Sequence, residues 1–163
     1  MSHAGLILLH PFLTQLFSNL ALLTDKKTFV DQDARRKALH VLAWLATGNE
    51  EVPEYDLQMP KLLTGWPLHE PISPFIDIDE NAQKMSKELL QAVITHWNAL
   101  GKTTPAGLRE GFIQREGRLC LEDRGWRLQV EQRTLDILLG KLPWGLGVVR
   151  LPWMDKLLFV DWA

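Results

Sequence analysis

The sequence predicts an α+β fold in which N-terminal helices pack against a C-terminal antiparallel hairpin within a small sheet. Apolar residues recur every three or four positions as far as Gly117, and after it they alternate with polar residues. Helices that come first and strands that come last are typical of the α+β class. No linker or low-complexity tract divides the chain, so we expect residues 1–163 to form a single globular domain, either alone or as a module of a longer protein.

Two helices are expected before residue 49. Pro11 suits the first turn of one, because the N–H that proline lacks has no partner at that position of a helix. Asp31 can cap the second helix, and Gly48 is a typical left-handed stop. Three cations near its start, residues 35–37, oppose the positive end of the helix dipole. We expect either an acidic neighbour for them or a solvated charged face.

The stretch between residues 49 and 79 holds five of the nine prolines, so we expect no regular element there. It also carries many apolar groups, including Tyr55, Trp66 and Phe75. A disordered linker would not contain so many of them. We therefore interpret the stretch as an ordered connection whose apolar and aromatic side chains need buried positions.

Two further helices are expected after this connection. Asp79 can cap the longer one, whose wide apolar face repeats every four residues and which is expected to end at Gly101. Thr104 can cap a short helix with Pro105 at its first position. This helix is expected to end before Gly117.

The alternation after Gly117 predicts a β-hairpin that turns at residues 123–125, with one buried and one solvated face. Residues 134–139 fit a short helix or a strand, and residues 146–151 and 157–162 are further strand candidates. The side chains expected on the buried face of the hairpin are Leu119, Leu121, Trp126, Leu128 and Val130.

Composition narrows the class of protein. Hydrophobic residues make up 46% and charged residues 23% of the chain, which is typical of a soluble globular protein. The formal net charge of −2 is too small to attract nucleic acid or an anionic membrane, so neither is an expected partner. The apolar run at residues 5–9 stops at His10 and is far shorter than the ~20 residues that span a bilayer.

One cysteine and one arginine-rich stretch need an interpretation. Cys120 cannot form an intramolecular disulfide, which favours folding in a reducing compartment. Its alternation away from the buried face of the hairpin would expose it, but nothing beside it indicates a nucleophile.

The arginines between Arg115 and Arg133 are nearly balanced by neighbouring acids. We therefore interpret this stretch as a solvated mixed-charge face and not as a nucleic-acid site.

No motif for catalysis or for cofactor binding occurs in the sequence, so we predict a non-enzymatic protein with no catalytic residue, cofactor or metal. The histidines lack the spacing of metal ligands, and His40 and His96 are expected at polar or half-buried helix positions. A small hydrolase is the alternative, and it would need distant polar groups to converge in one pocket. These groups are His69, Arg109, Glu110 and Asp136.

Several blocks, in order along nearly the whole chain, resemble the contractile injection system tape measure protein family. Each block is weak evidence alone, but the ordered set is specific. The blocks are residues 5–13 (GLILLHPFL), 44–48 (WLATG), 62–68 (LLTGWPL), 108–117 (LREGFIQREG), 142–144 (LPW), 151–154 (LPWM) and 158–162 (LFVDW).

The resemblance implies a structural and assembly role in a phage-tail-like particle, in which a sheath drives a tube and its spike into a target cell. Tape measure proteins occupy the tube lumen during assembly and are associated with setting its length. Their C-terminal region is expected near the baseplate and spike. The chain has no long helical or repetitive stretch, so we expect it to be such a terminal module or a short homologue.

The resemblance also implies partners and a location. The expected partners are tube, baseplate hub or spike proteins of the particle, or a second copy of the chain. The expected location is the bacterial cytoplasm during assembly, followed by the released or membrane-docked particle. An adaptor domain that binds cargo or a peptide on an exposed strand edge is a further alternative.

Two Leu-Pro-Trp segments close the chain and are expected to lie in bends. Pro143 and Pro152 cannot donate a backbone hydrogen bond, so they should interrupt regular structure beside Trp144 and Trp153. Each tryptophan either fills the core or contacts a partner, as aromatic and methionine side chains do at interface centres. The candidates for partner contact are Trp66, Trp144, Trp153 and Met154.

Overall fold

The computed structural model describes residues 1–162. Within this part, 3-10 or π-helical turns connect five α-helices and four strands. The α-helices are α1 (His10–Asn19), α2 (Gln32–Thr47), α3 (Gln58–Thr64), α4 (Glu80–His96) and α5 (Pro105–Leu108). The strands are β1 (Gly117–Glu122), β2 (Gly125–Val130), β3 (Val148–Val149) and β4 (Leu157–Asp161). The turns are η1 (Ala4–Leu9), η2 (Glu54–Asp56), η3 (Asn98–Leu100), η4 (Arg109–Ile113) and η5 (Thr134–Lys141).

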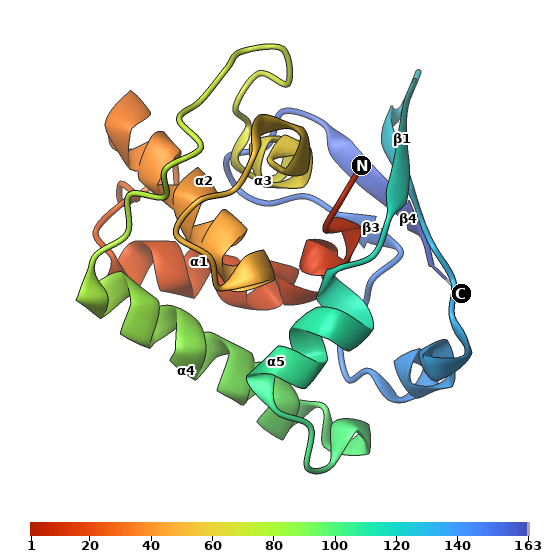
Figure 1. Ribbon diagram of the computed structural model, residues 1–163. Coiled ribbons are helices and arrows are strands. Elements are labelled where there is room, and N and C mark those ends of the chain that lie inside the picture. Colours follow the sequence, from red (N-terminus) through yellow and green to blue (C-terminus); the bar gives the residue numbers. More distant parts are fainter. Residues whose placement is uncertain (163) are drawn as a thin grey trace.

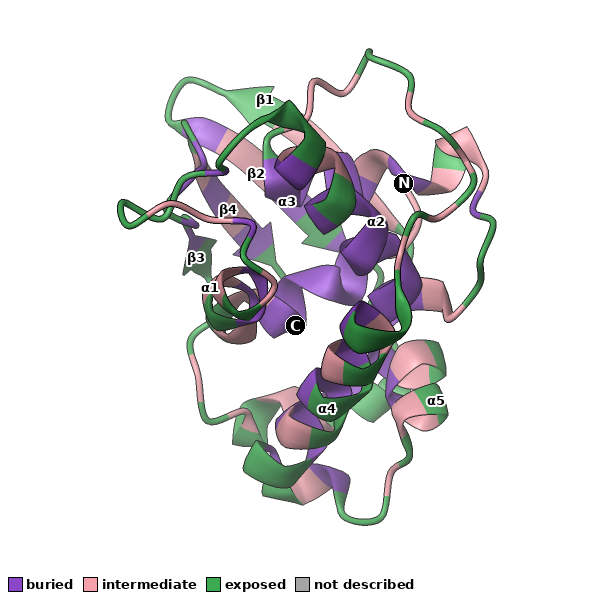
Figure 2. Cartoon of the chain, turned by 90° about the vertical axis from the view of Figure 1, so that its left-hand side faces the viewer, coloured by how far each residue is buried: buried purple, intermediate pink, exposed green. Residues whose placement is uncertain are grey.

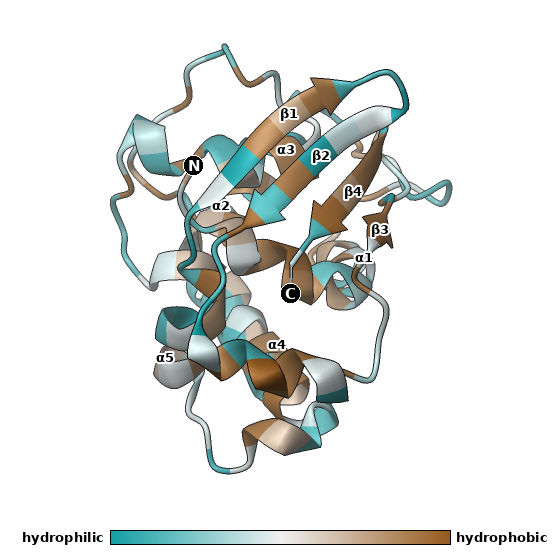
Figure 3. Cartoon of the chain, turned by 90° about the vertical axis from the view of Figure 1, so that its right-hand side faces the viewer, coloured by the Kyte–Doolittle hydropathy of each residue, from teal (hydrophilic) through white to brown (hydrophobic). Residues whose placement is uncertain are grey.

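The four strands form one mixed sheet in the order β1-β2-β4-β3. The α+β class and the antiparallel β1–β2 hairpin are as predicted, whereas β4 pairs with β2 in parallel. A parallel pair needs a crossover of a dozen or more residues, and residues 131–156 provide it. The helices gather on one side of the sheet (Figure 1). No helix of residues 1–162 lies over the opposite face of the sheet (Figure 3).

The N-terminal segment passes through the middle of the molecule. η1 is buried along its whole length, and its Ala4 N–H donates to the Arg115 carbonyl oxygen. At Gly5 a Cβ atom would lie 1.8 Å from the carbonyl oxygen of Phe112. The close approach of η1 to η4 therefore requires glycine at this position.

The ends of α2 are as predicted. The Asp31 carboxylate accepts a hydrogen bond from the Ala34 N–H at 2.7 Å, and Gly48 ends the helix with φ 70°. Of the two alternatives for the cations, the acidic neighbour is present for Arg36, which pairs with Asp33 at 2.7 Å and with Asp77 at 2.9 Å.

The connection between residues 49 and 79 differs from the prediction in two ways. It contains α3, and Pro60 lies in the first turn of that helix, where no N–H is needed. The aromatic residues were expected to be buried, but Tyr55 is 73% exposed and Phe75 is 67% exposed. Shorter aliphatic side chains, including Val52 and Leu57, fill the small apolar cluster under this loop instead.

The helices after Asp79 start where the sequence predicts. The Asp79 carboxylate accepts from the Ala82 N–H, and the Thr104 hydroxyl accepts from the Gly107 N–H. α4 ends at His96 rather than at Gly101, because the backbone of Trp97 leaves the helical region and η3 follows. The buried residues of α2, α3 and the sheet face one another at the centre of the molecule (Figure 2).

The hairpin turns at residues 123–124, one residue shorter than the predicted 123–125 because Gly125 begins β2, and its burial is partly as predicted. Leu128 and Val130 are buried, and Leu119 and Trp126 are half-buried on the face toward the helices. Leu121 was expected in the core but is 57% exposed. β1 is an edge strand whose Leu121 lies next to the turn, so this side chain has neighbours on fewer sides than Leu128.

The three C-terminal segments for which a helix or a strand was predicted form one helix and two strands. Residues 134–141 form the 3-10 helix η5, so the helical alternative for this segment is confirmed. β3 has two residues within the strand candidate 146–151, and β4 covers most of the candidate 157–162.

Candidate functional site

The last turn of α2 is closed by two side chains from the segment that begins at α5. Arg109 donates from Nε to the Leu45 carbonyl oxygen at 2.9 Å and from Nη2 to that of Trp44 at 3.2 Å. Gln114 donates to the Ala46 carbonyl oxygen at 2.8 Å. Carbonyl groups at the end of a helix lack partners within it, and a cation there also favours the helix dipole. Burial lowers the pKa of Arg109, but arginine remains charged because its ordinary pKa is so high.

A buried ion pair joins the same segment to η5. Arg115 is fully buried, and its two terminal nitrogens donate to the two carboxylate oxygens of Asp136. Two other N–H donors, on Nε and Nη1, reach the carbonyl oxygens of Gly111 and Glu131, each at 2.9 Å. A bidentate guanidinium–carboxylate pair of this kind fixes both distance and orientation. The prediction of a solvated position was therefore wrong for Arg115.

Asp136 accepts two further hydrogen bonds through Oδ2. It accepts from the Trp162 indole N–H at 3.1 Å and from the Arg133 backbone N–H at 3.0 Å. Burial acts to raise the pKa of Asp136, but the hydrogen bonds and charge of Arg115, with the other two donors, outweigh it and lower the pKa. The carboxylate therefore stays ionised, and four donors of the protein hold it in place.

The tryptophans of the two Leu-Pro-Trp segments donate to backbone carbonyls of distant blocks. Trp144 donates to the Leu8 carbonyl oxygen at 3.0 Å, and Trp153 donates to that of Leu63 at 2.7 Å. Trp153 is 7% exposed and packs against aromatic rings of the core. Trp144 is half-buried. Of the two roles considered for Trp153, its burial favours the core role.

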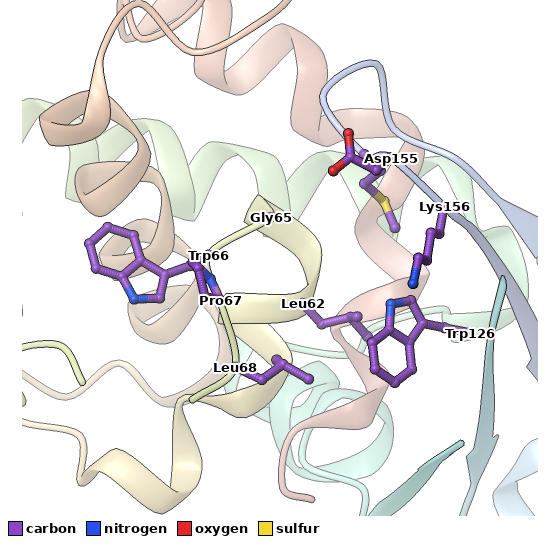
Figure 4. Close-up of a pocket in the computed structure, with 9 residues that line it drawn as sticks. Leu62, Gly65, Trp66, Pro67, Leu68, Trp126, Asp155 and Lys156 are labelled. Atoms are coloured by element: carbon purple, nitrogen blue, oxygen red, sulfur yellow. The ribbon is translucent and has the colours of Figure 1, made fainter. Parts of the chain in front are cut away.

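The remaining contact candidates border a shallow hollow between α3 and the sheet (Figure 4). Its volume is about 190 Å³, which is below the ~300 Å³ at the lower end of small-molecule sites. At the edge of the hollow, the Lys156 ammonium lies over the Trp126 ring, 5.8 Å from its centre. A hollow of this size suits one apolar side chain of a partner. It is lined by Leu62, Gly65, Trp66, Pro67, Leu68, Trp126, Met154, Asp155 and Lys156.

The two contact candidates at this hollow, Trp66 and Met154, differ in orientation and in burial. The Trp66 ring points away from the hollow, as Figure 4 shows, and its indole N–H donates to the Glu70 carbonyl oxygen at 3.3 Å. Met154 is only 7% exposed. The side chains that present apolar surface in the hollow are chiefly Leu68 and Trp126, which are half-buried. Sequence reasoning did not propose these two as contacts, because only the fold brings the loop after α3 beside β2.

Of the four groups that a hydrolase would need, two are bound to other parts of the chain and two are exposed. Arg109 is bound to α2 and Asp136 to Arg115, as described above. Glu110 and His69 are exposed, and they lie on η4 and on the loop after α3. Among residues 1–162, no three His, Cys, Asp or Glu side chains form a group that could hold a metal ion.

His40 is fully buried, in contrast to the polar or half-buried position predicted for it. Its Nε2 lies 3.1 Å from the Ser73 carbonyl oxygen, and its Nδ1 accepts from the Asp77 N–H at 3.1 Å. These contacts require a neutral ring with the proton on Nε2. Burial is the main reason why the pKa of His40 is lowered. The ring therefore attaches the loop before α4 to α2, and it is not available as a ligand. His96 is exposed, on a polar position as predicted.

The burial of Arg115 was missed although the sequence carries a signal for it. Arg115 comes three residues after Phe112, a spacing that would place both on one face of a helix, although η4 itself ends at Ile113. Phe112 is buried, and the Arg115 guanidinium lies 5.5 Å from the centre of its ring. The partner Asp136 could not be found in this way, because it belongs to a separate element.

These contacts belong to an α+β fold in which conspicuous polar residues join one element to another. A comparison with protein families matches residues 1–162 to the contractile injection system tape measure proteins, and the chain belongs to this family. The resemblance predicted from the sequence blocks is therefore confirmed. Searches of curated proteins and of solved structures gave no match. Within residues 1–162 no helix has the length and apolarity needed to cross a bilayer.

Proposed function

We propose that residues 1–163 act as one non-enzymatic structural and assembly module of a contractile injection particle, at the end of the tube that meets the baseplate and spike. The observation that carries this proposal is that the family-like blocks hydrogen-bond to one another. Residues 108–117 cap the block at 44–48, and the closing tryptophans reach the blocks at 5–13 and 62–68. Polar groups that are occupied in this way support a role in folding and assembly, not in chemistry.

The dimensions of the helices support a terminal module and not a ruler. The longest helix, α4, has 17 residues, which at ~1.5 Å per residue extend about 25 Å. A folded unit of this kind cannot extend along a tube. Length determination would therefore belong to other residues of the tape measure protein or to other components.

The hollow between α3 and the sheet is our proposed contact with a tube, hub or spike protein. It offers apolar surface from Leu68 and Trp126, with Lys156 at its edge. Of the four contact candidates, Trp66 and Trp144 are half-buried and keep some surface for a partner. Trp153 and Met154 are buried, so they would support this contact by packing behind the hollow. Contact would form in the bacterial cytoplasm during assembly and persist in the released or membrane-docked particle.

Cross-linking with mass spectrometry on assembled particles tests this proposal. We expect cross-links from Lys156 to a tube, hub or spike protein, because its side chain is exposed at the hollow. Lys156→Glu should reduce particle assembly, and Lys26→Glu, the same charge change at another exposed lysine, should not. Equal assembly of both variants, or cross-links of Lys156 to none of these components, would contradict the proposed contact. Turnover of an ester, phosphate or peptide substrate by the purified chain would contradict the non-enzymatic role.

One observation favours a second function, that of an adaptor for cargo or a peptide. β1 is an edge strand of the sheet, and an extended peptide could pair with it. Binding of a cargo segment, lost on substitution of Leu119 by proline but retained by Lys156→Glu, would support the adaptor. No comparable observation favours the hydrolase.

A further inference from the structure

The outer edge of β1 presents backbone groups that follow a defined pattern. β2 lies on one side of β1, and none of residues 1–162 forms a strand on the other. Glu131 donates its N–H to the Glu116 carbonyl oxygen, so Glu116 faces β2, whereas Gly117 donates away from β2 to the Met1 carbonyl oxygen at 2.8 Å. Backbone direction alternates along an antiparallel strand. The N–H and C=O groups of Leu119 and Leu121 therefore also point outward.

The free part of this edge is short and has a clear midpoint. Met1 occupies the outward groups of Gly117, and the hairpin turn follows Glu122. The free segment is therefore residues 118–122, with Cys120 at its centre. If two such segments pair antiparallel about this centre, Arg118 of one copy faces Glu122 of the other. Leu119 then faces Leu121, and Cys120 faces its own counterpart.

This register is complementary in charge, in apolar contact and in hydrogen bonding. Arg118 and Glu122 are both exposed and carry opposite charges, which stabilise a cross-strand pair. Glu122 already accepts from Arg127 at 2.8 Å through one oxygen, and the other oxygen can accept from Arg118 of the second copy. The outward groups of Leu119 and Leu121 form the hydrogen-bonded pairs, which leaves Cys120 at the non-hydrogen-bonded position.

The exposure of Leu121 supports the same pairing. This leucine lies on the face of the sheet that packs against the helices, yet 57% of it is exposed. In the proposed register, Leu119 of the second copy lies directly across from it, on the same face. Pairing would therefore cover apolar surface that a single copy leaves in water.

We propose that β1 pairs antiparallel with β1 of a second copy, centred on Cys120, so that the two sheets form one continuous sheet. A foreign peptide would need only an open edge. A second copy additionally accounts for the self-complementary order of arginine, leucine, cysteine, leucine and glutamate along the free segment. A pairing of five residues is small, so we expect a dimer that dissociates on dilution.

Charge reversal tests the register. Sedimentation equilibrium of the full chain over a concentration series should show a reversible dimer. Arg118→Glu or Glu122→Arg should each raise the dimer dissociation constant roughly tenfold or more, because like charges then face each other twice. The double variant should recover the dimer, and the two single variants should pair when mixed. Lys84→Glu, which reverses an exposed charge on α4, far from β1 in Figure 1, should leave the dissociation constant unchanged.

Oxidation of Cys120 supplies an independent readout. A non-hydrogen-bonded pair has Cα atoms about 4.5 Å apart, within the range that a disulfide bridges. Copper–phenanthroline should therefore convert the wild-type dimer to a covalent one. The variant that combines Cys120→Ser with Glu122→Cys should form no covalent dimer, because the cysteine introduced at position 122 would face Arg118 of the second copy. A wild-type chain that is monomeric throughout, or charge-reversed partners that fail to pair, would overturn the proposal. A monomer that binds an unrelated peptide along β1 would also overturn the proposal. None of these results would decide the proposed role in the particle, which the cross-linking experiment tests separately.

Discussion

Replacing Asp136 with alanine removes the carboxylate that pairs with the buried Arg115 guanidinium. Arg115 is fully buried, and the Asp136 side chain is 6% exposed. The substitution deletes two hydrogen bonds from Arg115 and leaves the Trp162 indole N–H without its acceptor. Removal of one partner from a buried ion pair costs about 3–5 kcal/mol, because the remaining charge stays out of water. We expect a loss of this size in the free energy of unfolding.

The loss would be large beside the total stability of the chain. A domain of this size has a stability of about 5–15 kcal/mol, and its Tm falls by about 2–4 °C for each kcal/mol lost. Asp136→Ala should therefore lower the Tm by roughly 6–20 °C. Urea unfolding followed by tryptophan fluorescence and by circular dichroism measures the free energy. Coincident transitions from the two probes would justify a two-state treatment.

Two further variants separate the buried charge from other effects. Asp161→Ala breaks the exposed pair with Arg127, at 3.0 Å, and should cost no more than about 1 kcal/mol. Arg115→Met combined with Asp136→Leu replaces both charges with apolar groups, and it should recover most of the loss. A cost below about 1 kcal/mol for Asp136→Ala would show that the pair does not hold η5 to the core, and would refute the reasoning.

Three other predictions concern packing and pH. Gly5→Ala should lower the free energy of unfolding by roughly 1–3 kcal/mol or more, because the added Cβ would lie 1.8 Å from the Phe112 backbone. Gly140→Ala is the control: its added Cβ meets nothing within 4 Å, so urea unfolding should show no loss of stability. Trp153→Ala should cost on the order of 3–5 kcal/mol; an unchanged Tm together with failed particle assembly would instead assign Trp153 to an interface. The folded-state pKa of His40 is lowered, chiefly by burial, so its contribution to stability is complete above the unfolded value of about 6.5 and is lost as pH falls through the folded value. Unfolding free energies measured at several pH values should show a shallower decline for His40→Gln than for the wild type.

Local chemistry explains why most helix boundaries could be read from the sequence. Asp31, Asp79 and Thr104 each accept a hydrogen bond from an N–H three residues ahead, a contact that needs no distant part of the chain. The hairpin is equally local, since a two-residue turn aligns β1 with β2. The helix α3 was not predicted, although proline in a first turn is compatible with a helix. The end of α4 was placed too late, because the 3-10 turn η3 lies between this helix and Gly101.

The candidate site was less accessible to sequence reasoning. Trp66 and Met154 were named as contacts, yet the apolar surface of the hollow comes largely from Leu68 and Trp126. These two residues are far apart in the sequence, and no local pattern relates them. Their meeting depends on how α3 packs beside the sheet.

The sequence by itself determined the α+β class, the family, the helix caps and the hairpin, because each depends on neighbouring residues or on the order of blocks. The tertiary structure decided which charged and apolar groups lose contact with water. Arg115 is buried because Asp136, 21 positions away, satisfies its charge. Leu121 is exposed because β1 lies at an edge, although it alternates in phase with buried neighbours. Burial is a property of the space around a side chain, and that space is formed by segments that are distant along the chain.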